Sequence, residues 1–255
     1  MNKTLLAGLA ILALASGSAI AADMPPPAFK APPAPTPTWT GCYINGGGGY
    51  GMSNIDHNLE TLPGLAALDL NTTAGGRGWF GTAGAGCDYQ FNAFNNWNVV
   101  VGAFGDYNFM DIHGHVNDAF SGLGGNVSED WAWAGGLRAG ILVTPSLLTY
   151  INGGFTQTGF GLHNLSSTFT GAPSGFAVPS HTFDGWFIGG GTEYAVPGIP
   201  GLFWRNEYRF STYQTSDVAN IVAATGAPAG TANRTQPTVQ TIATELVFRF
   251  NWLGL

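Results

Sequence analysis

The sequence has few charged side chains and no long apolar segment after its first two dozen residues. Asp, Glu, Lys and Arg together make up 9% of the 255 residues, whereas ordinary soluble domains contain about 25%. A soluble two-sheet protein of this length needs such side chains to cover its outward faces. A helical membrane protein needs continuous apolar runs of about 20 residues. The composition therefore disfavours both classes.

Glycine and aromatic residues are abundant instead, with 39 glycines and 13% Phe, Trp and Tyr. This composition suits a membrane β-barrel, in which the apolar residues occupy alternate strand positions. The segment 241–252 shows the alternation, because Leu246, Phe248 and Phe250 are interleaved with Glu245 and Arg249. Successive side chains of a strand point to opposite faces, so this segment has an apolar face and a charged face.

The first residues have the layout of an export signal. Asn2-Lys3 is a short basic start, an apolar stretch follows, and Ala19-Ile20-Ala21 provides a small-x-small cleavage site. We therefore predict a cleaved signal peptide over residues 1–21. Residues 22–38 contain seven of the 15 prolines and are predicted to form an extended periplasmic tether. The barrel domain is predicted over residues 39–255.

Eight alternating segments follow the tether, and the remaining prolines fall between them or at their starts, where strands tolerate proline. An even strand number is usual in bacterial single-chain barrels. The sequence thus predicts an all-β fold, an eight-stranded antiparallel up-and-down transmembrane β-barrel. The segments are 39–53, 76–91, 97–112, 129–143, 147–162, 182–196, 202–214 and 238–252.

The predicted connections alternate in length. Those over 54–75, 113–128, 163–181 and 215–237 are long, whereas those over 92–96, 144–146 and 197–201 are short. Membrane barrels have long external loops and short periplasmic turns. We therefore predict four long loops at the cell surface.

Four arginines and five carboxylates lie on the strand faces opposite the apolar rows. The interior of an eight-stranded barrel is just wide enough to be filled by side chains, and ions buried there must be paired. We predict a charged network in the lumen; the alternative is an ion-conducting constriction. Glu245 and Arg249 are expected to meet Arg205, Glu207 and Arg209 on the neighbouring strand. The nine residues are Asp88, Asp106, Arg138, Glu193, Arg205, Glu207, Arg209, Glu245 and Arg249.

Tryptophan and tyrosine near strand ends suit the interfacial girdles of membrane barrels, where the ring is in apolar surroundings and its polar atom stays wet. The predicted interfacial aromatics are Trp39, Tyr43, Trp97, Trp131, Trp133, Trp186, Trp204 and Trp252.

The two cysteines, Cys42 and Cys87, are near the periplasmic ends of the first two predicted strands. Both occupy alternate strand positions that face outward. A cross-strand disulfide would therefore form in an oxidising compartment if the register of the two strands places the cysteines opposite each other. Two free thiols are the alternative.

The candidates for chemistry are weak. Asp111, His113 and His115 form an Asp-x-His-x-His cluster that could bind Zn²⁺ or Cu²⁺, but such residues in a loop more often face solvent. We predict no resident metal, no cofactor and no enzyme activity. The predicted loops are acidic, which argues against nucleic acid as a partner.

Three stretches carry a family resemblance. Trp39-Thr40-Gly41-Cys42-Tyr43-Ile44 resembles the mature start of the small outer-membrane β-barrel proteins of alphaproteobacteria, the opacity-type porin family. The stretches 185–194 and 206–210 resemble the penultimate hairpin of that family. The resemblance implies a barrel inserted into the outer membrane from the periplasm. Its implied partners are outer-membrane lipid, lipopolysaccharide and the barrel-insertion machinery.

Three functions are compatible with these patterns. The first is a structural, surface-exposed outer-membrane barrel with a filled lumen, and the second is a narrow porin for small ions or solutes. The third is a soluble periplasmic ligand-binding barrel with its aromatic face turned inward.

Overall fold

The computed structural model describes residues 37–68, 70–93, 97–118 and 121–250. The predicted signal peptide, nearly all of the predicted tether, and Trp252 lie outside these residues. Within the described ranges, no helix is both long and apolar enough to cross a membrane, a result that does not bear on β-barrels.

In the part of the chain that the structure describes, eleven antiparallel strands form one sheet, and eight of them close into a ring in the order β1-β2-β3-β4-β5-β8-β9-β11. Strands β1 and β11 close the ring through a continuous register from Cys42–Phe250 to Thr61–Thr231. Closure leaves neither of these strands with a free edge. The predicted eight-stranded up-and-down barrel is therefore confirmed. The strands are β1 (Gly41–Thr61), β2 (Thr72–Ala93), β3 (Trp97–Asp118), β4 (Leu123–Thr144), β5 (Leu147–Phe160), β6 (His163–Ser167), β7 (Pro173–Val178), β8 (His181–Ala195), β9 (Leu202–Tyr213), β10 (Ser216–Val222) and β11 (Pro228–Phe250).

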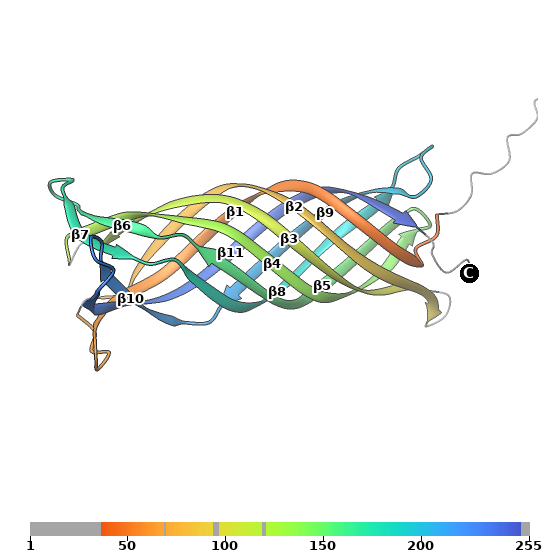
Figure 1. Ribbon diagram of the computed structural model, residues 1–255. Helices are drawn as coiled ribbons and strands as arrows, with labels where there is room; N and C mark the ends of the chain where they lie inside the picture. Colours follow the sequence, from red (N-terminus) through yellow and green to blue (C-terminus); the bar gives the residue numbers. More distant parts are fainter. Residues whose placement is uncertain (1–36, 69, 94–96, 119–120, 251–255) are drawn as a thin grey trace, which may run out of the picture. The chain divides into compact units, whose positions relative to one another are not determined.

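The three remaining strands, β6, β7 and β10, continue the barrel beyond β5, β8 and β9 and gather at one end (Figure 1). At this end β4 pairs with β6, β6 with β7, β7 with β10, and β10 with β11. We call it the outer end. The opposite end carries the short connections, which face the periplasm in barrels of this type, and we call it the periplasmic end.

The prediction of four long external loops is wrong for most of their length. Strand β1 continues to Thr61 and β2 begins at Thr72, so much of the predicted loop 54–75 is strand. Likewise β3 continues to Asp118 and β4 begins at Leu123. The two other predicted loops contain β6 and β7, and β10 with the start of β11.

The reason is that the apolar face of the sheet changes sides along the barrel: it faces outward toward the periplasmic end and inward toward the outer end. Toward the periplasmic end, the outward side chains are apolar, as at Leu246 and Phe248. Toward the outer end, apolar side chains such as Ile55 and Ile112 are buried inside, and Asp56 and Asp111 are exposed outside. A search for outward apolar rows therefore ends each strand too early.

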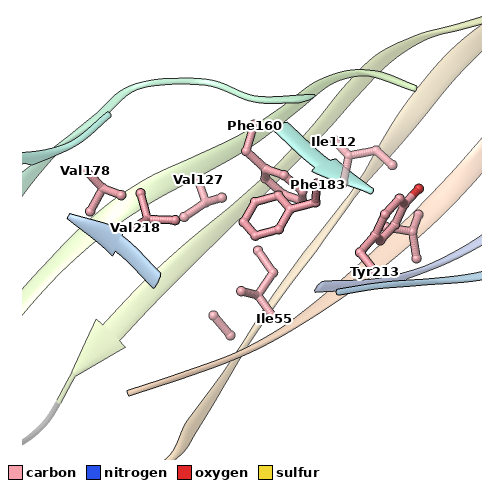
Figure 2. Packing of buried hydrophobic residues seen from close by; sticks show 10 residues of the cluster. Ile55, Ile112, Val127, Phe160, Val178, Phe183, Tyr213 and Val218 are labelled. Atoms are coloured by element: carbon pink, nitrogen blue, oxygen red, sulfur yellow. The ribbon is translucent and has the colours of Figure 1, made fainter. Parts of the chain in front are cut away.

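Among the described residues, two clusters of buried apolar side chains lie in the interior. One is in the outer part of the barrel, where side chains from several strands converge (Figure 2). It comprises Ile55, Ala74, Ile112, Val127, Phe160, Val178, Phe183, Tyr213, Val218 and Val239. The other is toward the periplasmic end and comprises Trp39, Tyr43, Val100, Leu148, Tyr150, Phe203 and Val247.

Candidate functional site in the barrel lumen

The structure places all nine predicted charged residues on inward strand faces and joins them by hydrogen bonds; we call this set the lumen ion network. Strand β9 alone contributes three members, at every second position from 205 to 209. The side chains of Asp88 and Glu193 are fully buried, and that of Arg209, the most exposed, is 13% exposed. The network consists of two groups at different heights along the barrel.

Glu193 on β8 is the centre of the first group, because its two carboxylate oxygens accept hydrogen bonds from three arginines. Arg249 donates to Oε1 at 2.6 and 2.9 Å. Arg205 donates to Oε2 at 3.0 and 3.1 Å, and Arg138 donates to the same oxygen at 3.1 Å. One carboxylate thus holds together guanidinium groups from β4, β9 and β11.

Asp88 on β2 is the second anion of this group. Arg138 binds it through both Nε, at 2.8 Å, and Nη2, the forked geometry that guanidinium and carboxylate groups favour. Arg249 also donates to Asp88, at 2.6 Å. Glu245 completes the group by contacting Arg205 at 3.4 Å and accepting a hydrogen bond from Asn45 at 2.7 Å. The expected contact between Glu245 and Arg205 is thus present, whereas Arg249 reaches across the lumen to β2 and β8.

Tyr43 lies among these arginines. The guanidinium carbons of Arg138, Arg205 and Arg249 are 4.7, 4.9 and 4.9 Å from the centre of its ring. A cation this close to an aromatic face is attracted by the ring quadrupole. The side chain is 1% exposed, so the prediction that Tyr43 belongs to an interfacial girdle is wrong.

Trp39 is also inside the barrel, with 0% exposure, and not in the predicted girdle. The indole Nε1 donates to the carbonyl of Pro145 at 3.1 Å. The ring packs against Phe203 with centroids 4.7 Å apart, and Arg249 is 5.1 Å from its centre. Because Trp39 precedes β1, it covers the first group of the network from the periplasmic side.

The second group is built on Arg209. Its guanidinium donates to both oxygens of Asp106, at 3.0 and 2.8 Å, and to Glu207 Oε1 at 3.2 and 2.8 Å. Tyr150 and Asn152 on β5 each donate to the other oxygen of Glu207 at 2.8 Å. These contacts connect β3, β5 and β9 across the lumen.

Two inward glycines make room for these groups. A Cβ added at Gly102 would overlap the Asp88 carboxylate, and one added at Gly86 would lie 2.6 Å from Cζ of Tyr43. Both positions face the lumen beside β1 and β2, where any larger residue would displace the ring or the carboxylate. The close packing of the first group therefore depends on glycine at these positions.

The network pairs every lumen arginine with at least one carboxylate. Five carboxylates face four guanidiniums, so the paired charges nearly cancel. Four cations with no partner would cost several kcal/mol each in this interior. The arrangement offers no free nucleophile or base, and its chemical effect is to occupy the lumen with fixed, mutually neutralised charge.

Cys42 and Cys87 form a disulfide, and their positions are directly opposite in the register of β1 and β2. Cys87 is exposed on the outer face, and the bond is at the periplasmic end of the hairpin. The two cysteines are 45 positions apart in the sequence.

Reduction of this disulfide is expected to lower the free energy of unfolding by about 2–4 kcal/mol, because the cross-link restricts the unfolded chain. The measurement is the guanidinium-induced unfolding midpoint with and without reductant. The double variant Cys42→Ser/Cys87→Ser is the control. Its unfolding midpoint should match that of the reduced wild-type protein and should not change when reductant is added. An unchanged wild-type midpoint would contradict the expectation.

Four predicted interfacial aromatics are exposed on the outer face, and another is partly exposed. Trp131 is half-buried, with its ring stacked on Tyr107 at a centroid distance of 6.4 Å. Trp204 donates from Nε1 to Thr244 at 2.6 Å, and Trp133 donates to Gln157 at 3.0 Å. Their rings thus face outward, and these two have a polar partner for the indole nitrogen. The exposed residues are Trp97, Trp133, Trp186 and Trp204.

The Asp-x-His-x-His cluster does not converge. His113 contacts Asp111 at 2.7 Å, whereas His115 contacts Asn126 on β4 at 2.9 Å. Throughout the described ranges, no group of three His, Cys, Asp or Glu side chains is arranged to hold a metal ion.

Comparison with known proteins identifies the family to which the chain belongs. The 31 kDa outer-membrane immunogenic proteins of Brucella melitensis and Brucella suis are each 31% identical to this chain over 235 residues, covering 87% of it and 91% of the relative. No family model matches.

Among solved structures, Ail of Yersinia pestis is similar at 10% identity, with a TM-score of 0.32 and coverage of 82% of this chain and 99% of Ail. Neisserial surface protein A is similar at 11% identity, with a TM-score of 0.34 and coverage of 83% and 98%. Likeness at this level supports no statement about this chain.

The relatives match 87% of the chain, and the outward apolar face toward the periplasmic end suits contact with lipid. A soluble periplasmic barrel is therefore excluded. The chain belongs to the family of outer-membrane β-barrel proteins that includes the 31 kDa outer-membrane immunogenic proteins of Brucella.

Proposed function

We propose that this protein is a structural barrel of the outer membrane that presents its outer strands and turns at the cell surface and does not conduct ions. The observation that carries the proposal is the lumen ion network, above all Glu193 with its three arginines. Aromatic rings occupy the space around them, with Tyr43 among the guanidiniums and Trp39 on the periplasmic side.

The physical argument against conduction is the cost of making a path. An ion can pass only if some of these side chains leave the lumen centre, which separates buried charges from their partners. An eight-stranded barrel has little space to which they could withdraw. A narrow porin would instead need charged side chains that line a water-filled constriction.

Single-channel recording in planar bilayers tests the proposal. The folded protein, verified by its heat-shifted gel mobility, is expected to give no reproducible conductance steps at physiological salt. A general porin reconstituted in the same way is the positive control. Reproducible steps from the wild-type protein would overturn the closed-lumen proposal in favour of the narrow porin.

The proposed partners are outer-membrane lipid and lipopolysaccharide around the apolar face, and the barrel-insertion machinery during assembly. The outward apolar rows and the family relationship support them. The name of the relatives, which calls them immunogenic, agrees with display at the cell surface.

We further propose that the protein is not an enzyme. His181 contacts Ser216 at 3.2 Å and His113 contacts Asp111, but these pairs are on different strands. A hydrolytic triad needs one histidine between the hydroxyl and the carboxylate.

A further inference from the structure

The outer part of the barrel contains a partly open cavity of about 240 Å³, whose lining is mostly apolar, unlike that of the charged lumen. We call it the outer chamber. Its wall includes Ile55, Val127, Val178 and Val218, which converge from β1, β4, β7 and β10 (Figure 2). Protein interiors contain few voids larger than a water molecule. A cavity of about 150 Å³ with an apolar lining is enough to bind benzene, so the outer chamber is large enough for a larger small molecule.

We propose that the outer chamber binds a small uncharged aromatic molecule, of about the size of a two-ring compound. The proposal goes beyond the structural role argued above and does not depend on whether the lumen conducts.

Aromatic side chains give the chamber its chemistry. Phe160 and Phe183 meet edge to face, with ring centroids 5.6 Å apart and an angle of 89° between their planes. His181 meets Phe183 in a similar way, at 4.7 Å and 71°. Aromatic pairs favour such arrangements beyond the effect of buried area. A flat aromatic ligand can extend this set, whereas an alkyl chain gains only the burial of apolar surface.

The charge of the lining argues for a neutral ligand. The described residues that line the cavity include three histidines and two asparagines but no Asp, Glu, Lys or Arg. His57 contacts Thr72 and His181 contacts Ser216, at 3.0 and 3.2 Å. Burial lowers the pKa of His163 below its usual value of 6.5, so its ring is neutral at pH 7. A charged ligand would therefore lose its water and find no counter-ion.

One polar atom in the wall can add specificity. Nδ1 of His163 is buried and has no hydrogen-bond partner among the described residues. The atom has no accessible surface as the ring lies, so a hydroxyl group on the ligand would satisfy it once the imidazole turns toward the cavity. A mostly apolar pocket with a few placed polar groups is the usual form of a small-molecule site.

The probe for the test is 1-naphthol, added to the folded protein in lipid nanodiscs whose Ile and Val methyl groups are labelled for NMR. We expect saturable shifts at Ile55, Val127, Val178 and Val218. The lipid-facing methyl groups of Ile151 and Ile188, both exposed on the outer face, should show only weak shifts that do not saturate. Equal, unsaturable shifts on both sides of the barrel wall would overturn the proposal.

Variants and matched ligands sharpen the result. Val218→Phe fills the chamber and should weaken binding about tenfold or more, whereas Ile188→Phe on the lipid side should leave it unchanged. Val178→Phe fills the same space from another strand and serves if the first variant does not fold. Undiminished binding in a folded chamber-filling variant would contradict the site. If the anion 1-naphthoate binds as tightly as 1-naphthol, the inferred preference for an uncharged ligand is wrong. If 1-octanol binds as tightly as 1-naphthol, the inferred preference for an aromatic ligand is wrong.

Discussion

Replacing Glu193 by glutamine should lower the free energy of unfolding by about 3–5 kcal/mol, the range measured when one member of a buried ion pair is removed. The glutamine keeps the shape of the side chain but not its charge. Arg138, Arg205 and Arg249 would then share the charges of Asp88 and Glu245 alone. The loss comes from leaving buried guanidinium charge without compensation, not from a cavity.

Denaturant-induced unfolding in lipid vesicles, followed by tryptophan fluorescence, measures this difference. The matched control is Asp184→Asn, the same chemical change on the same strand. The carboxylate of Asp184 is exposed and accepts a hydrogen bond from Gln157 at 2.7 Å, so its replacement should change stability by no more than about 0.5 kcal/mol. If the two variants lose equal stability, the network does not hold the barrel together in the way described.

Placing an arginine at Leu137 should cost about 2–4 kcal/mol of folding free energy, the penalty for a cation on the lipid face near the bilayer midplane. Leu137 is 69% exposed on the outer face of β4. It is midway along that strand's outward row, which runs from Trp131 to Val143. The arginine would have lipid around it and no carboxylate on that row.

The same vesicle assay measures the effect, and Asn126→Arg is the control. Asn126 is exposed on the outer face of the same strand, near the outer end, where it pairs with the exposed His115 of β3. This substitution should change stability by no more than about 0.5 kcal/mol. Similar costs at both positions would contradict the placement of the lipid-facing band.

Much of the barrel follows from strand alternation and from where proline is tolerated. These two patterns predict eight strands, the short periplasmic turns and the inward direction of the nine charged residues. They do not predict which ions meet. Arg249 passes its neighbouring strand β9 and binds Asp88 and Glu193, because contacts across the lumen depend on barrel width and side-chain reach.

The errors at Tyr43 and Trp39 have different causes. Alternation from the outward Ile44 requires Tyr43 to face inward, and this local pattern decides its position over the general preference of tyrosine for membrane interfaces. Trp39 precedes β1, so strand alternation cannot predict the direction in which its side chain points. Its position depends on the chain turning under the barrel to reach Pro145, a contact between residues 106 positions apart.

A single outward apolar row does not predict the outer parts of the strands. A strand that passes from lipid into water keeps its alternation but exchanges its faces. Asn54-Ile55-Asp56-His57 alternates as regularly as the segments below it, with the apolar residue inside. Alternation in the opposite phase predicts both the longer strands β1 to β4 and the apolar interior of the outer end.

This exchange of faces also fixes the depth at which the barrel sits. A displacement of one residue pair toward the periplasm would draw Asp111 and Asp130 into hydrocarbon, and the opposite displacement would lift Phe109 and Trp133, which are exposed on the outer face just below them, toward water. The chain thus needs no separate anchor to set its height. A bilayer of another thickness must thin or thicken locally around the protein, at a cost of a fraction of a kcal/mol per Å. The ring of lipids next to the barrel is therefore shaped by the protein, and membranes of matching thickness retain it best.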